Sequence, residues 1–151
     1  MKEFEDQFSE LQADMISICL EYVEDRAEKV YVYASCEETF ISANFFYLKN
    51  SKYVMSHEVN EALEEGELKI DDSSERGFKV LEILADDIKK IKSLCEEYGR
   101  DMPTEMKLIY DVKTGHFKAE YKYDFIHFYH ETKTASDVFE EWFEEVQKNK
   151  L

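Results

Sequence analysis

The sequence predicts an α+β fold in which an antiparallel sheet of about five strands packs against an N-terminal helix, a long central helix and a C-terminal helix. Three stretches repeat apolar residues every three or four positions, the period of a helix buried on one side. Shorter stretches are rich in β-branched and aromatic residues or alternate apolar with polar, as strands do. Turn-like sequences join most of these strands, which favours hairpins and antiparallel pairing. The length suits one domain over residues 1–151.

The first expected element is an amphipathic helix of about six turns. Its apolar positions alternate at spacings of four and three, with acids on the other side; they are Phe4, Phe8, Leu11, Met15, Ile18 and Tyr22. Strands are expected next over 30–34, 42–48 and 53–56. Residues 49–52 have the composition of a turn between the last two strands.

Residues 57–72 show no helical or strand periodicity, so we expect a long irregular loop there. Between Glu58 and Glu75 the chain has eight acids and one base, Lys69, which is a net charge of −7 in eighteen positions. Long irregular loops in compact domains are usually functional or mobile. Asp72-Ser-Ser-Glu75 resembles a capping box, which predicts that a helix begins at this point.

The second half of the chain is expected to hold a long helix, a hairpin and a last helix. The long helix has apolar residues at 81, 84, 88, 91, 95 and 98 and should end at Gly99. Residues 106–110 and 117–125 alternate as strands across the turn Lys113-Thr114-Gly115-His116. Thr134 is placed to cap the final helix, whose apolar residues are Val138, Phe139, Trp142, Phe143 and Val146.

The charge limits the classes of partner. The chain has 35 acidic and 19 basic residues, a formal net charge of −16. Such a field repels nucleic acid and anionic lipid and attracts basic proteins, so we expect no direct nucleic-acid or membrane binding. No uncharged stretch approaches the roughly 18 residues of a membrane span, and the first residues lack a secretion-signal pattern. With three widely spaced cysteines and no CxxC pair, these features predict a cytoplasmic protein.

No familiar catalytic framework is present in the sequence. Its four glycines form no phosphate-binding or dinucleotide-binding motif, and no nucleophile elbow occurs. The best candidates for chemistry are His127 and His130: on a helix they would share a face, whereas on a strand they would point to opposite sides of the sheet. A small metal-dependent enzyme using these histidines is therefore an alternative. The main expectation is a protein without enzymatic activity, metal or cofactor.

Aromatic motifs recur along most of the chain. They are Val30-Tyr31-Val32-Tyr33-Ala34-Ser35, Phe45-Phe46-Tyr47, Tyr53-Val54-Met55-Ser56-His57-Glu58, Pro103, Lys107-Leu108, Tyr110-Asp111, Gly115-His116-Phe117, Tyr121-Lys122-Tyr123-Asp124 and a C-terminal part with Trp142. This series resembles the YezG-like immunity (antitoxin) proteins, a family without catalytic signatures. The resemblance implies a small acidic cytoplasmic protein of bacteria. Such a protein binds and neutralises the C-terminal domain of a cognate polymorphic or contact-dependent toxin, often a nuclease.

We therefore expect an immunity protein that acts by stoichiometric occlusion, because an acidic protein can be steered into the basic cleft of a nuclease and cover it. The expected partner-binding residues are Tyr53, His57, Glu58, Glu61, Glu64, Glu65, Asp71 and Asp72. A solvated, mobile loop is the competing interpretation of these acids. A second candidate face is formed by Asp137, Glu140, Glu141, Glu144 and Glu145. An acidic adaptor or DNA mimic that binds basic host proteins without a toxin is a further alternative.

Overall fold

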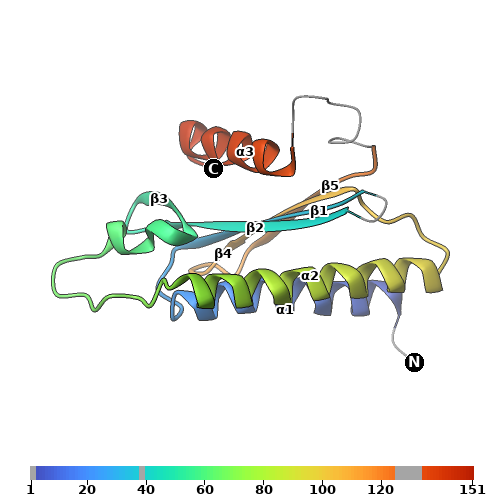
Figure 1. The fold of residues 1–151 in the computed structure, drawn as a ribbon, viewed down its shortest axis with the longest axis horizontal. Helices are drawn as coiled ribbons and strands as arrows, with labels where there is room; N and C mark the ends of the chain where they lie inside the picture. The colour runs from blue at the N-terminus through green and yellow to red at the C-terminus, as the bar shows by residue number, and fades with distance from the viewer. Residues whose placement is uncertain (1–2, 38–39, 125–133) are drawn as a thin grey trace.

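The computed structural model describes residues 3–37, 40–124 and 134–151. The elements are, in chain order, α1 (Phe4–Tyr22), β1 (Lys29–Glu37), β2 (Phe40–Lys49), β3 (Lys52–Met55), the 3-10 helix η1 (Ser56–Ala62), α2 (Ser74–Glu97), β4 (Glu105–Asp111), β5 (Phe117–Lys122) and α3 (Ala135–Asn149). The five strands form one antiparallel sheet. Helices α1 and α2 lie side by side on one face of it, and α3 lies on the other (Figure 1). The predicted α+β architecture is confirmed.

Strand β1 is the centre of the sheet, whose order is β3-β2-β1-β4-β5. Tyr31 pairs with Phe46 of β2 on one side and with Ile109 of β4 on the other. Because successive side chains of a strand point to opposite faces, β1 contributes to two cores. Val30 and Val32 pack with α1 and α2, whereas Tyr31 and Tyr33 pack with α3.

The core beneath α1 and α2 is mainly aliphatic and sulfur-containing. Met15 and Cys19 of α1 and Leu84 and Ile88 of α2 are fully buried against the sheet. Cys19, Cys36 and Cys95 are all buried free thiols. Cys19 and Cys95 therefore act as small apolar residues, as their positions on the helical stripes predict.

The core beneath α3 is aromatic. Phe46 stacks on Tyr31 with ring centroids 4.5 Å apart, and the rings of Trp142 and Phe143 meet Phe46 edge-on at 5.1 and 4.9 Å. Such edge-to-face geometry is the favourable arrangement for aromatic pairs. Thr134 caps α3 as predicted, because its hydroxyl accepts a hydrogen bond from the backbone amide of Asp137 at 3.2 Å.

Two local predictions are wrong. The carboxylate of Asp71 accepts a hydrogen bond from the amide of Ser73 at 3.1 Å, and Ser73 becomes the N-cap of α2 without a side-chain cap of its own. This Asx-type turn replaces the capping box predicted for 72–75. The segment 57–72 is also not wholly irregular, since η1 covers its beginning and buries Val59. The first three strands begin or end a few residues away from their predicted bounds. Gly99 follows the end of α2 in the left-handed region, as expected (φ 64°).

A pair of carboxyl groups lies between the two helices on the lower face of the sheet. Asp87 of α2 is 2% exposed and hydrogen-bonds to Asp14 of α1. Burial, this hydrogen bond and the charge of Asp14 raise the pKa of Asp87 to about 7, against a smaller opposing effect of Lys90. Folding therefore makes Asp87 easier to protonate than it is in the unfolded chain.

We predict that Asp87→Asn stabilises the protein above pH 7. A raised carboxyl pKa contributes stability that is full below about pH 4 and is lost as the pH rises through about 7. The variant should exceed the wild type by roughly 1–3 kcal/mol in unfolding free energy at pH 8 and match it at about pH 4. Urea unfolding at both pH values measures this. Glu82→Gln, a change at an exposed acid of the same helix, is the control and should alter neither value. A wild type equally stable at both pH values would contradict the prediction.

Candidate functional site

The acidic segment, residues 57–72, leads from β3 to α2 at one end of the sheet, on the left in Figure 1. Glu67 ties it to the rest of the protein. One carboxylate oxygen accepts hydrogen bonds from Lys49 Nζ at 2.6 Å and Arg26 Nη1 at 2.8 Å, while the other accepts from the Glu64 amide at 2.9 Å and Asn50 Nδ2 at 3.2 Å. Four groups from three parts of the chain thus converge on one side chain.

The charge of Glu67 is needed at this position. Lys49 is 1% exposed, and a buried ammonium is costly unless it is paired. The hydrogen bond from Lys49, with those from the Glu64 amide and Asn50, lowers the pKa of Glu67 to about 2. The carboxylate is therefore ionised throughout the physiological range.

A second anchor lies at Asn60. Its side-chain amide donates to the carbonyl of Ile70 and accepts from the amide of Ile70, both at 2.8 Å. This pair of bonds joins the two ends of the acidic segment, and Ala62 and Ile70 are buried beneath it. The backbone of the segment is thus held by buried contacts, which disfavours the interpretation as a solvated, mobile loop.

The predicted partner-binding residues differ in their exposure to solvent and in the part of the structure where they lie. Most point into solvent from the acidic segment: His57, Glu61, Glu64, Glu65 and Asp71 are exposed. Glu58 and Asp72 are half-buried, and the Glu58 carboxylate accepts a hydrogen bond from the Met55 amide at 3.1 Å. Tyr53 is half-buried in the aromatic core beneath α3, with its ring centroid 6.3 Å from that of Tyr31. The structure therefore brings the acids together on one segment and places Tyr53 in the aromatic core.

Leu68 is an exposed residue of the acidic segment that was not among the predicted partner-binding residues. Its side chain is 82% exposed, in the middle of the acidic segment, while its carbonyl accepts a hydrogen bond from Arg26 Nη1 at 2.7 Å. The available signal was a leucine with charged residues on both sides, Glu67 and Lys69, in a stretch without helical or strand periodicity. The role of Glu67 was also missed, because nothing in the sequence links it to Lys49 or Arg26, which lie 18 and 41 positions away.

The arrangement offers exposed carboxylates around an apolar side chain, and no metal chemistry is apparent in it. Across residues 3–37, 40–124 and 134–151, no group of three or more His, Cys, Asp or Glu side chains is placed to hold a metal ion. His127 and His130 lie outside the described residues, so the structure does not test the alternative of a small metal-dependent enzyme that uses them. Within the described part of the chain, no helix has both the length and the apolar character needed to cross a membrane.

No family model and no curated protein matches this chain. The resemblance to YezG-like immunity proteins therefore stays a prediction from the sequence.

We predict that Glu67→Gln loosens the acidic segment and lowers the free energy of unfolding by roughly 1–3 kcal/mol at pH 7, because it leaves Lys49 without its counter-charge. A lowered carboxyl pKa contributes stability above about pH 4.5 that is lost as the pH falls towards 2. The wild type and the variant should therefore converge at low pH. Urea unfolding at pH 7 and pH 3, with amide hydrogen exchange across residues 57–72, measures both effects.

Glu65→Gln is the matched control, because Glu65 is exposed and only two positions away. It should leave stability and exchange unchanged. Equal stability of wild type and Glu67→Gln at pH 7 would show that the ion pairs do not hold the segment.

Proposed function

We propose that the protein is an immunity protein that binds a basic toxin domain, most simply a nuclease, and neutralises it by stoichiometric occlusion without turnover. The acidic segment is the proposed contact surface. The observation that carries the proposal is a set of solvent-facing carboxylates, at Glu61, Glu64, Glu65 and Asp71, on a backbone fixed by Glu67 and Asn60. The aromatic motifs that resemble the YezG-like family support the same function.

Fixed carboxylates favour tight binding for an entropic reason. Ordering a loop at the moment of association costs free energy, and a segment ordered beforehand avoids that cost. Interfaces also draw much of their affinity from a few side chains that become fully buried at the centre of the contact. Leu68 has this character, since it is the large apolar side chain exposed within the acidic segment.

The charge supports fast association with a basic partner. Surface charges beyond a Debye length of about 8 Å are screened at physiological salt, so steering depends on charges close to the contact. The acids of the segment are the dense local source of the overall charge of −16. A cleft that binds phosphates is lined by lysine and arginine, which such a surface complements.

The neutralisation test uses the gene next to the one that encodes this chain. We expect co-expression to rescue cells from the toxicity of the product of the adjacent upstream gene, with the two proteins copurifying at equal stoichiometry. The purified chain alone should hydrolyse no nucleic acid. Absence of rescue, or turnover by the chain alone, would contradict the proposal.

A charge-reversal test locates the surface. Replacing Glu61, Glu64, Glu65 and Asp71 by lysine should slow association about tenfold or more at low salt and flatten its salt dependence. The matched control reverses the same number of exposed acids on α2: Glu82, Asp86, Glu96 and Glu97. Both variants carry the same net charge, so a difference between them reports position. Stopped-flow association with the partner is the measurement, and equal rates for the two variants would move the contact surface away from the acidic segment.

Two results would favour the alternatives. Zinc or manganese bound at one ion per purified chain would favour a metal-dependent enzyme using His127 and His130. Stoichiometric binding to basic chromosomal proteins, with no effect of the neighbouring gene product, would favour an acidic adaptor or DNA mimic.

A further inference from the structure

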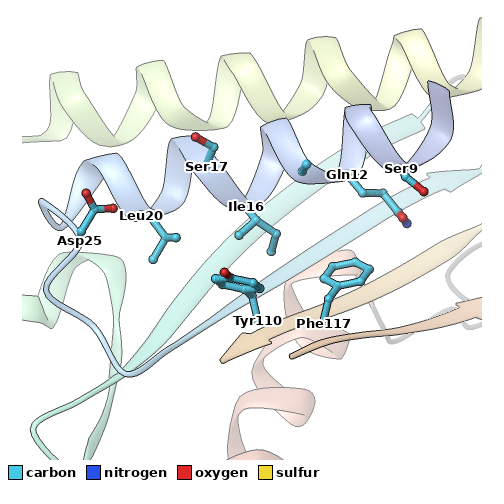
Figure 2. Close-up of a pocket in the computed structure, with 9 residues that line it drawn as sticks. Ser9, Gln12, Ile16, Ser17, Leu20, Asp25, Tyr110 and Phe117 are labelled. Atoms are coloured by element: carbon cyan, nitrogen blue, oxygen red, sulfur yellow. The ribbon is translucent and has the colours of Figure 1, made fainter. Parts of the chain in front are cut away.

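A groove separates α1 from the β4–β5 hairpin. It has a volume of about 400 Å³ and lies where α1 leaves the last strands of the sheet partly uncovered (Figure 2). Ile16 and Leu20 of α1 point towards Tyr110 of β4 and Phe117 of β5 across it (Figure 2). Phe117 is 40% exposed, so the groove has an apolar floor that opens to solvent. A volume of this size accommodates several side chains of a ligand.

The two ends of the groove differ in chemistry. At one end the buried Gln12 donates a hydrogen bond to the hydroxyl of Tyr121 at 2.7 Å, which closes the groove with polar groups that are already paired. At the other end lies Asp25, just beyond the C-terminus of α1 (Figure 2). No described side chain forms an ion pair or hydrogen bond with the Asp25 carboxylate in the structure.

The Asp25 end is electrostatically unfavourable as it stands. The C-terminus of a helix carries partial negative charge, which basic residues normally complement. Helix α1 has no basic residue in its last turn, and three acids, Glu21, Glu24 and Asp25, lie within five positions at this end. Glu24 reaches Arg26 at 3.5 Å, which leaves Asp25 uncompensated at the mouth of the groove.

Backbone strain accompanies this charge. Glu24 and Asp25 both adopt the left-handed region, with φ of 56° and 60°. Non-glycine residues rarely do so, and two in succession are costly unless the surroundings hold them. The amide of Asp25 is held by the carbonyl of Leu20 at 2.9 Å, so the turn fixes the carboxylate at the end of the groove.

We propose that this groove binds an amphipathic segment of a partner polypeptide, with apolar side chains between α1 and the hairpin and a lysine or arginine against Asp25. Charge complementarity selects this occupant: α1 contains no basic residue, and Asp25 is the charged residue among the described residues that line the groove. A second copy of the chain would bring another net charge of −16 to the same surface, which disfavours self-association.

The groove and the acidic segment are joined. Arg26 follows Asp25 and donates hydrogen bonds to Glu67 and to the Leu68 carbonyl. One partner surface can therefore touch both. The inference rests on the proposed function for the identity of that partner, whereas the presence of a peptide-binding groove is testable without it.

The test uses synthetic peptides of about twelve residues with equal numbers of leucine and lysine. In one peptide the leucines lie on one helical face, and in the other the same residues are scrambled. We expect the first to bind with amide chemical-shift changes along Ala13–Leu20 and at Tyr110 and Phe117. Ser17→Trp, which fills the groove from its exposed wall, should weaken binding at least about tenfold.

Asp25→Asn keeps a residue that tolerates the left-handed region and removes only the charge. It should weaken binding about two- to fivefold. The matched controls are Ser136→Trp on α3 and Asp101→Asn after α2, both at exposed positions outside the groove. Both should bind the peptide as the wild type does, and circular dichroism should confirm that all four variants fold.

Several results would overturn the inference: equal binding of the scrambled peptide, shifts confined to residues 57–72, or unchanged affinity of Ser17→Trp. A wild-type dimer that Ser17→Trp dissociates would also overturn it, since the groove would then be a self-interface. The peptide assay contains no toxin and is independent of the co-expression test. Peptide binding together with failed rescue in the co-expression test would refute the proposed function but not the peptide-binding groove.

Discussion

The structure depends on one strand that is buried from every side. β1 pairs with β2 and β4 along its two edges and is covered by helices on both faces, and Val30 to Glu37 are all buried. Alternation along this strand divides the interior into an aliphatic core under α1 and α2 and an aromatic core under α3. These two cores supply the burial that must outweigh the mutual repulsion of a chain with a net charge of −16.

Two buried ionisable side chains, Lys49 and Asp87, contribute to the stability of the fold in ways that the exposed acids do not. Lys49 is buried and paired with Glu67, and that pair fixes the conformation of an otherwise exposed acidic segment. Asp87 is buried against Asp14 and is easier to protonate than in the unfolded chain. The two carboxyl groups respond in opposite ways: Glu67 is stabilised in its ionised form by Lys49 and other hydrogen-bond donors, whereas the pKa of Asp87 is raised by burial and by the neighbouring Asp14.

The proposed contact surface lies near the Asp25 end of the groove, just beyond the C-terminus of α1, and Arg26 links the two. Both combine an apolar element with uncompensated negative charge: Leu68 among glutamates, and the groove floor beside Asp25. A basic partner with an apolar anchor complements both features. Burial of the anchor would provide affinity, and the charges would provide orientation and rate.

Periodicity alone determined most of the elements. Local apolar spacing predicted the three α-helices α1, α2 and α3 and the β4–β5 hairpin. It does so because each element must bury one side, whatever it packs against. The sequence also determined the acidic surface, since charge is additive along the chain. Tertiary structure decided the rest. It set the strand order with β1 at the centre, the pairing of Glu67 with Lys49 and Arg26, and the groove beside α1. It also left Leu68 exposed. These features depend on residues that are far apart in sequence. Local spacing holds no information about such contacts, because they depend on how the packed layers meet.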